Sequence, residues 1–302
     1  MDRITAVQLF IRVVETGSFS KSAAGLGITQ PTATKAVAAI EARLGARLLH
    51  RSTRGVTTTE VGALYYERCK VIAREIDDAD NLATLLQGRL GGVLRISTSV
   101  AFGRRVMVPL VLHYMRQHPD LAVDLGFDDR YVNLVEQGVD LALRMGRLAD
   151  SSLGARHLGI NPWLTVASPT YLAQRGTPAQ PQELARHACL VYSSVQGDER
   201  WTYTAADGEV TAVPVKGPLR SNNLSAVLAA ARAGLGVAVL PHYVARESVA
   251  DGSLRPVLES HLLPVQELHA VFPSPKLVPS KVTHFIGFLQ QALQGAWWQT
   301  AL

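Results

Sequence analysis

Apolar residues recur at helical spacing through the first 45 residues and predict three short helices. The first helix contains Leu9 and ends at Gly17, because glycine readily takes the left-handed conformation that closes a helix. We expect Ser20 to be the N-cap of the second helix and Thr29 the N-cap of the third, which ends at Gly45. The expected inward positions of the third helix are Val37, Ile40 and Leu44.

The second and third helices, joined by a tight turn at Gly27, have the layout of a helix-turn-helix. Residues 48–59 then read as two short strands around an arginine-bearing turn, which we interpret as a wing over the DNA backbone or minor groove. Polar and basic side chains in these places can read base edges or bind phosphates. The expected DNA-binding residues are Gln30, Pro31, Thr32, Thr34, Lys35, Arg51, Thr53 and Arg54.

A long helix is predicted to start at Thr58 or Thr59 and to run to Leu86. From Tyr65 onward its apolar residues alternate in steps of four and three, the pattern of a helix that pairs with another helix. A protein that binds two dyad-related DNA half-sites does so as a dimer, which favours this pairing. The alternative is that the apolar stripe packs on the chain's own next domain. The expected dimerisation residues are Tyr65, Cys69, Ile72, Ile76 and Ala83.

Beyond a glycine-rich boundary at residues 88–92, short strands alternate with helices, which predicts a parallel sheet wound with helices. Strands are expected at 93–97, 121–127, 141–144, 164–167, 190–192, 212–215, 237–240 and 268–272. Helices are expected near 106–117, 131–137, 224–233 and 278–294. Ligands of such sheets bind at the carboxyl ends of the strands.

The positive charge is concentrated at the start of the chain. The formal net charge is +5, and residues 1–56 hold eight Lys and Arg against three acids. Four arginines, Arg43, Arg47, Arg51 and Arg54, lie in a stretch without acids between Glu41 and Glu60. A basic patch on one small segment indicates a polyanionic partner, although a basic run alone is more often a solvated surface.

The remaining composition is that of a globular protein, with 47% hydrophobic and 18% charged residues. The first residues do not form a signal peptide, and the longest apolar stretch, 233–240, is too short to span a bilayer. The two cysteines form no CxxC motif, which fits a reducing cytoplasm. Cys69 is expected to be a core residue rather than a redox sensor.

No motif predicts catalysis, a metal or a cofactor. Ser18 and Lys21 fit the S-x-x-K pattern of serine acyl enzymes but lie at a helix junction. Gly234 and Gly236 precede a strand, whereas a dinucleotide loop would follow one. The histidines are scattered and lack metal-ligand spacing.

Taken together, the N-terminal residues resemble the winged helix-turn-helix of LysR-type transcriptional regulators. The matching positions are Leu9, Phe10, Gly17–Phe19, Ala23, Ala24, Leu26, Gln30, Pro31, Thr34, Glu41, Leu44, Gly45, Arg51, Arg54, Thr59 and Gly62. Two positions depart from the family pattern. Leu49 stands where Phe is usual, and Lys35, where Arg is common, lacks the bidentate fork of Arg and should discriminate bases more weakly. The resemblance continues more loosely to the C-terminal part, through segments such as 94–96, 140–144, 150–153, 167–169, 233–237 and 240–241.

This resemblance implies an α/β fold with an N-terminal winged helix-turn-helix, a long linker helix and a C-terminal two-lobed domain like the periplasmic binding proteins. The implied domains are a DNA-binding domain at 1–60, a dimerisation helix at 61–88 and an effector-binding domain at 89–302. Lobe I would comprise 89–162 and 266–302, and lobe II 163–265, with the chain crossing between them near Pro162 and Pro264.

The resemblance also implies a small-molecule effector between the lobes, for which we expect a carboxylate held at the helix start after residue 99. The alternative is that Thr98 and Ser99 only cap that helix. The expected effector-binding residues are Thr98, Ser99, Val100, Phe102, Arg144, Ala167, Ser168, Leu240 and Pro241.

The expected function is therefore that of a cytoplasmic, non-enzymatic, effector-controlled transcriptional regulator. Its partners would be a partly dyadic DNA operator and a second copy of itself, in a homodimer or homotetramer, with RNA polymerase as a candidate and no membrane. The alternatives are a small-molecule-binding protein or enzyme with a basic N-terminal head, and an architectural DNA protein. The sequence leaves open the effector, the promoter and the choice between activation and repression.

Overall fold

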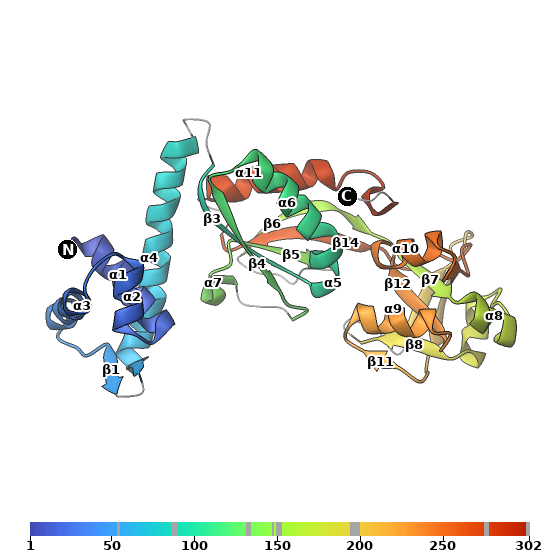
Figure 1. Cartoon of the computed structure of the whole chain (residues 1–302). Helices are drawn as coiled ribbons and strands as arrows, with labels where there is room; N and C mark the ends of the chain where they lie inside the picture. The colour runs from blue at the N-terminus through green and yellow to red at the C-terminus, as the bar shows by residue number, and fades with distance from the viewer. Residues whose placement is uncertain are drawn as a thin grey trace. The chain divides into compact units, whose positions relative to one another are not determined.

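The computed structural model describes residues 1–52, 55–85, 90–130, 134–146, 148, 153–193, 200–274 and 278–299. Contacts divide the chain into two units, Met1–Gly92 and Val93–Leu302. Figure 1 shows the course of the chain through both units, each of which has its own hydrophobic core.

Unit 1 contains three short helices, a two-stranded wing and one long helix. The helices are α1 (Arg3–Thr16), α2 (Phe19–Gly25), α3 (Gln30–Leu44) and α4 (Glu60–Leu85), and β1 (Leu49–Ser52) pairs antiparallel with β2 (Gly55–Thr58). Gly17 and Gly45 end α1 and α3 in the left-handed conformation, which confirms both predicted stops. Thr29 caps α3 as predicted, through a hydrogen bond from the Thr32 N–H.

Two details of unit 1 were predicted wrongly. Ser18, not Ser20, caps α2, because Ser18 has extended backbone and its Oγ accepts the Lys21 N–H at 3.3 Å. Leu44 is 43% exposed, because α3 ends immediately after it, whereas Ala33, Val37 and Ile40 of the same helix are buried in the core.

The first turns of α4 pack on the chain's own helix-turn-helix. Cys69 is 1% exposed within the core of unit 1, and the Tyr65 ring lies 5.4 Å from the ring of Phe10 in α1. The prediction that Cys69 faces a partner helix is therefore wrong, and Tyr65 also packs within the chain. Both residues pack within unit 1, whereas the alternative had placed the apolar stripe against the next domain.

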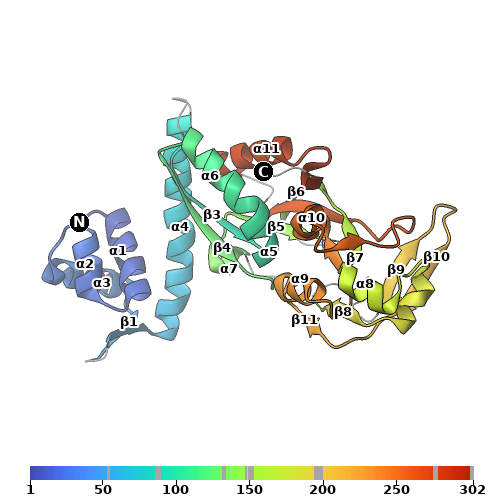
Figure 2. The ribbon, with the colours of Figure 1, turned by 45° about the vertical axis from the view of Figure 1, so that its right-hand side comes forward.

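Unit 2 contains two five-stranded sheets, which we call lobe I and lobe II after their order in the chain. The lobe I sheet has the strand order β4-β3-β5-β14-β6. Its strands are β3 (Gly92–Thr98), β4 (Leu121–Phe127), β5 (Leu141–Met145), β6 (Gly154–Asn161) and β14 (Gln266–Phe272). Helices α5 (Val100–Phe102), α6 (Val108–Gln117), α7 (Leu134–Gln137) and α11 (Ser280–Ala292) accompany it, with a π-helical turn, Gly103–Met107, between α5 and α6. Figures 1 and 2 show α6 beside α11 on this sheet.

The lobe II sheet has the order β11-β8-β12-β7-β13. Its strands are β7 (Trp163–Ala167), β8 (Cys189–Tyr192), β11 (Arg220–Ser221), β12 (Val237–Pro241) and β13 (Arg255–Pro256). Helices α8 (Pro169–Arg175), α9 (Leu224–Arg232) and α10 (His242–Ala250), with 3-10 turns at Pro181–Arg186 and Trp297–Gln299, complete unit 2.

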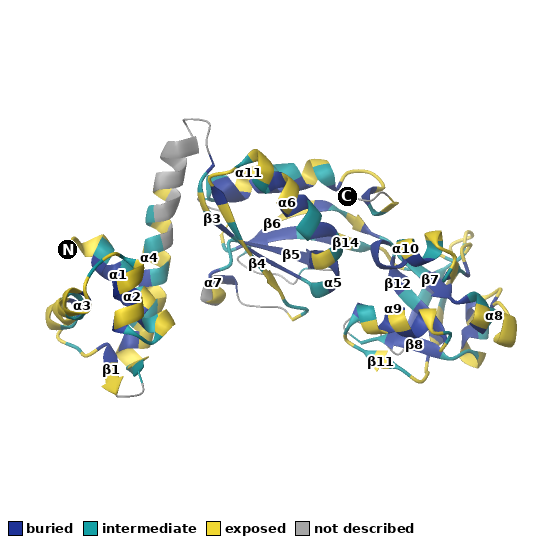
Figure 3. Cartoon of the chain, viewed as in Figure 1, coloured by how far each residue is buried: buried dark blue, intermediate teal, exposed yellow. Residues whose placement is uncertain are grey.

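The sheets are mixed rather than parallel. In lobe I, β14 runs antiparallel to β5 and β6, and in lobe II β12 runs antiparallel to β7, while β3–β5 and β12–β8 are parallel. The strand expected at 212–215 lies instead in β10 (Val210–Pro214), which forms a separate hairpin with β9 (Arg200–Thr204). The central strands β5 and β14 are largely buried (Figure 3).

The chain passes between the two sheets at two places. β6 ends in lobe I at Asn161 and β7 begins in lobe II at Trp163, so Pro162 stands at the first crossing. Between β13 in lobe II and β14 in lobe I, residues 257–265 make the second crossing, which includes Pro264.

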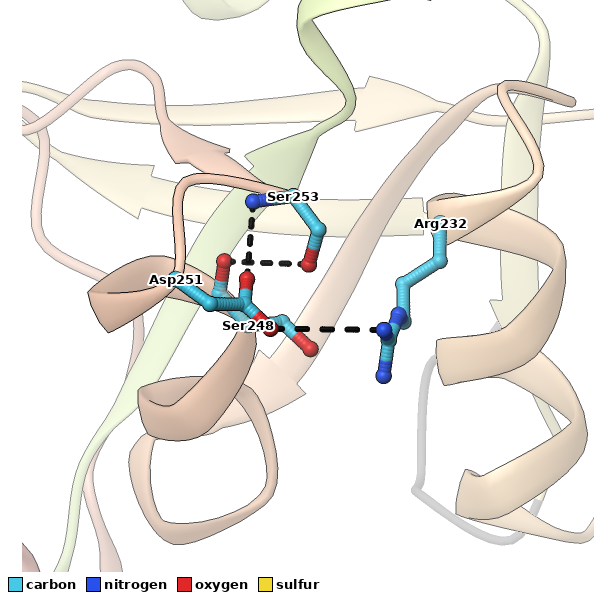
Figure 4. Close-up of polar contacts among 4 residues, drawn as sticks. All are labelled: Arg232, Ser248, Asp251 and Ser253. Carbon is cyan, nitrogen blue, oxygen red and sulfur yellow. Dashed lines mark hydrogen bonds and ion pairs between the residues drawn. The ribbon is translucent and has the colours of Figure 1, made fainter.

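A polar corner joins the ends of α9 and α10 in lobe II (Figure 4). Asp251 accepts the Ser253 N–H at 2.8 Å and lies 4.0 Å from the Arg232 guanidinium. Hydrogen bonds from Ser253 hold the pKa of Asp251 below its usual value. Both charged side chains are about half exposed, so this pair orients the corner more than it stabilises the lobe.

Candidate DNA-binding surface and effector cavity

The first turn of α3 presents the predicted base-reading side chains to solvent. Gln30, Pro31, Thr32 and Lys35 are exposed, and Thr34 is half-buried. The Thr32 hydroxyl already shares a 2.9 Å hydrogen bond with the Thr29 hydroxyl at the helix cap. Gln30 and Lys35 are the long exposed side chains near the start of α3 that can reach DNA.

Contacts from α2 orient two of these DNA-binding candidates. The Ser20 hydroxyl donates to Gln30 Oε1 at 2.8 Å, which links the two helices of the helix-turn-helix. The Arg51 guanidinium in β1 lies 4.6 Å from the ring centroid of Phe19, a cation–π contact that positions this exposed cation. Thr53 and Arg54, also predicted as DNA-binding, lie outside the described residues.

Two surface grooves lined partly by α3 contain basic side chains, together with Asp2 in the first and Glu41 in the second. The first, of about 480 Å³, is lined by ten residues that include Arg3, Lys35 and Arg43. The second, of about 500 Å³, includes Arg47 and Arg51. Arg3, Arg43 and Arg47 were not among the predicted DNA-binding residues, although the acid-free run after Glu41 contains two of them.

A cavity of about 100 Å³ in unit 2 is lined by residues from both lobes. Three predicted effector-binding residues line it: Ser99, Arg144 and Pro241. The other lining residues are Asp128, Asp129, Leu143, Met145, Trp163, Tyr192, Leu224, Tyr243 and Gln266.

Several predicted effector-binding residues are packed in the core instead of lining this cavity. Ala167 and Leu240 are fully buried, and Ser168 uses its Oγ to cap α8 by accepting the Tyr171 N–H. Phe102 is fully buried against the rings of Tyr243 and Trp297. Thr98 is fully buried as well. The side chains of these five residues therefore face the core and do not line this cavity, and their assignment to the effector stays a prediction.

The helix start after Ser99 is already occupied by a side chain of the protein. The Val100 N–H donates to Asp129 Oδ1 at 3.0 Å, and the neighbouring Asp128 accepts the Arg130 N–H. A carboxylate ligand at this point would meet two acidic side chains rather than a free N–H. The predicted role of Val100 as a carboxylate donor is therefore wrong.

Two of the nine cavity residues that were not predicted, Trp163 and Gln266, lie beside the crossings between the lobes. Trp163 follows Pro162, and Gln266 comes two residues after Pro264. Because segments that cross between two lobes border the space between them, the two prolines were the available signal.

Within the described residues, no three His, Cys, Asp or Glu side chains form a group that could hold a metal ion. Both cysteines are buried. Burial raises the pKa of the Cys189 thiol to about 12 and that of Cys69 above its usual value, so neither thiol is activated as a nucleophile. No helix in the described part of the chain is long and apolar enough to cross a membrane.

Family models match both units of the chain. Residues 4–63 match the bacterial regulatory helix-turn-helix protein, lysR family, and residues 87–294 match the LysR substrate binding domain. An uncharacterized HTH-type transcriptional regulator of Haemophilus influenzae is 35% identical over 283 residues, which cover 94% of this chain and 98% of the relative. The regulator CrgA of Neisseria meningitidis serogroup C is 32% identical over 286 residues, covering 94% and 95%.

Two solved structures are similar to this chain over nearly its full length. The structure of CrgA from Neisseria meningitidis has a TM-score of 0.62 at 30% identity and covers 96% of this chain and 99% of its own. The full-length Vibrio cholerae virulence activator AphB has a TM-score of 0.61 at 28% identity, covering 97% and 100%. The chain therefore belongs to the LysR family of transcriptional regulators, with an N-terminal helix-turn-helix DNA-binding domain and a C-terminal effector-binding domain.

Proposed function

We propose that this regulator binds a partly dyadic operator as a homodimer or homotetramer, and that a small molecule in the cavity between its lobes controls it. In this proposal residues 1–60 bind DNA, residues 61–88 dimerise and residues 89–302 bind the effector. The protein acts in the cytoplasm and catalyses no reaction. Its relatives are named as transcriptional regulators, which favours this function over a metabolic enzyme with a basic head.

The observation that carries the proposal is the exposed surface formed by the first turn of α3 and by β1. It presents Gln30, Lys35 and Arg51, and the sequence has no acid between Glu41 and Glu60. An amide on the recognition helix suits base edges, whereas a cation on the wing suits phosphates.

Selection from a random DNA pool tests this division of roles. We expect Arg51→Ala to weaken binding to all sequences and to reduce the slope of log affinity against log salt by about one, because one phosphate contact is lost. Gln30→Ala should instead relax the preference at one base pair, by about 1–3 kcal/mol.

Arg175→Ala is the matched control, because it removes an exposed arginine from α8 in unit 2. It should leave both the affinity and the salt slope unchanged. Equal slopes for Arg51→Ala and the parent would show that the wing does not contact phosphate.

The dimerisation surface that we propose lies on the exposed side of α4. Tyr65 and Cys69 pack inward, whereas Val61, Leu64, Val71 and Ile72 are 50%, 68%, 39% and 53% exposed. These four residues are separated by three, seven and one positions, so they share one side of the helix. That side lies next to the side formed by Tyr65 and Cys69. Ile76 is half-buried, and the side chain of Ala83 lies outside the described residues.

Ile72→Glu should therefore dissociate the dimer at micromolar concentration, because a dimer would bury the new charge without a partner. Light scattering measures the mass directly. Val210→Glu is the control, since Val210 is a 63% exposed apolar residue of β10. Retention of the parent mass by Ile72→Glu would exclude this face as the interface.

A further inference from the structure

Three side chains at the two crossings between the lobes form one hydrogen-bonded group. Gln266 Oε1, at the start of β14, accepts from Trp163 Nε1 at 3.0 Å and from Asn161 Nδ2 at 3.1 Å. Asn161 ends β6 and faces Gln266 in the strand register, while Trp163 begins β7 in the other lobe. Gln266 thus joins both crossing segments.

The chemistry of this group determines which way its amides point. An indole N–H can only donate, so the Gln266 atom that faces Trp163 must be the carbonyl oxygen. Because the same oxygen faces Asn161, that residue must present its NH2 group to Gln266. Asn161 is fully buried, and its Oδ1 has no hydrogen-bond partner among the described residues.

The Gln266 NH2 group is the part of this network left for a ligand. Gln266 lines the cavity, and within the described residues its Nε2 has no hydrogen-bond acceptor. A buried acceptor without a partner in Asn161 is costly, and such groups persist in native proteins where function requires them. The two N–H groups that donate to Gln266 Oε1 keep the Gln266 NH2 group directed away from Asn161 and Trp163.

We propose that Gln266 recognises a hydrogen-bond-accepting oxygen of the effector, with Asn161 and Trp163 as its positioning residues. This inference rests on the proposed effector cavity and adds the class of ligand. The Ser99 hydroxyl and the Arg144 guanidinium line the same cavity and suit the same acceptor. Asp128 and Asp129 disfavour a dianion, so the acceptor is a carbonyl or a single carboxylate.

The residues that line the cavity also favour a ligand with an aromatic ring. The rings of Trp163 and Tyr192 lie 6.1 Å apart, and both line the cavity together with Tyr243. Aromatic side chains of this kind stack on planar ligands. A single ring that bears one small acceptor is consistent with a cavity of about 100 Å³.

Calorimetric titration of the full chain with four benzene derivatives tests the proposal. Benzamide carries a carbonyl, benzoate a single carboxylate, phthalate two carboxylates and benzylamine no acceptor. We expect benzamide or benzoate to bind at least tenfold more tightly than phthalate and benzylamine. Binding of none of the four, or a preference for benzylamine or phthalate, would overturn the proposed class.

Two variants test the role of Gln266 itself. Gln266→Glu still accepts from Asn161 and Trp163 but replaces the donor by a carboxylate oxygen, so benzoate should lose at least tenfold in affinity and benzamide less. Trp163→Phe keeps a ring but removes the donor that fixes the amide, and affinity should fall about threefold. The benzoate-to-benzamide ratio is the decisive readout, because loss of structure alone would weaken both ligands equally.

Ser99→Trp, which fills the cavity, tests whether the cavity is the effector site independently of the role of Gln266. If it abolishes binding while Gln266→Glu leaves the ratio unchanged, the cavity is the effector site and the role of Gln266 is refuted. If binding survives Ser99→Trp, the effector site lies elsewhere and the proposed cavity fails together with this inference.

Discussion

Gly62→Ala should destabilise the DNA-binding unit while leaving the stability of unit 2 unchanged. Gly62 lies in the first turn of α4, and a Cβ added there would lie 1.8 Å from the Leu48 carbonyl oxygen. That oxygen cannot move away easily, because it accepts the Thr59 N–H at 2.9 Å and Leu48 is fully buried. We expect the change to cost about 3 kcal/mol or more, a large share of the stability of a small domain.

The distribution of tryptophans allows the two units to be followed separately. All four tryptophans lie at position 163 or beyond, so their fluorescence reports unit 2, whereas circular dichroism at 222 nm reports helices in both units. We expect unit 1 to give its own transition in the dichroism curve. Gly62→Ala should lower the midpoint of that transition, leave the fluorescence midpoint unchanged and weaken DNA binding.

Gly287→Ala is the matched control, because Gly287 lies inside α11 and a Cβ there meets nothing within 4 Å. This change should be neutral or stabilise by up to about 1 kcal/mol, the usual gain of Ala over Gly in a helix. A Gly62→Ala protein as stable as the parent would mean that the junction between Leu48 and α4 can open without cost.

The elements of unit 1 were predictable because their limits are set by local chemistry. Glycine at positions 17 and 45 ends a helix in any surroundings, and Thr29 caps one through its own neighbours. Ser18 and Ser20 could not be distinguished from sequence, since both hydroxyls precede the apolar residues Ala23 and Ala24, and only the backbone shows that Ser18 is extended while Ser20 lies inside the helix. Gly62 matched the family pattern, but its steric reason is visible only once Leu48 is placed beneath it.

The residues of α4 show why a helical pattern does not identify its partner. Steps of four and three predicted one apolar stripe from Tyr65, but Tyr65 and Cys69 pack on α1 whereas Ile72 is exposed. The spacing indicates that the residues share one side of the helix. Tertiary contacts determine which element packs against that side.

The cavity between the lobes was the least predictable region because its residues come from distant segments. The turn after β3, the crossing at Trp163 and the start of β14 at Gln266 meet only in the folded chain. Of the positions taken from the family resemblance, Ser99, Arg144 and Pro241 line the cavity. The resemblance could not distinguish a side chain that lines the cavity from one that faces the core, such as Leu240.

Lys281→Met should destabilise unit 2 by about 3–5 kcal/mol, because it leaves a largely buried carboxylate without its counter-charge. Lys281 is 3% exposed in α11, and its ammonium lies 3.4 Å from Asp140 and donates to the Val93 carbonyl at 2.9 Å. Asp140 also accepts the Arg95 N–H at 2.9 Å, so the ion pair joins α11 to two neighbouring strands of lobe I.

The double variant Lys281→Met, Asp140→Asn distinguishes lost attraction from an uncompensated charge. Asparagine keeps an acceptor for the Arg95 N–H and removes the buried negative charge, so the double variant should be more stable than Lys281→Met alone. Urea unfolding followed by tryptophan fluorescence measures both values in unit 2. If the second change adds to the loss instead of reversing it, the carboxylate is adequately solvated without the lysine, and Lys281 stabilises the lobe through its bond to Val93 rather than through its charge.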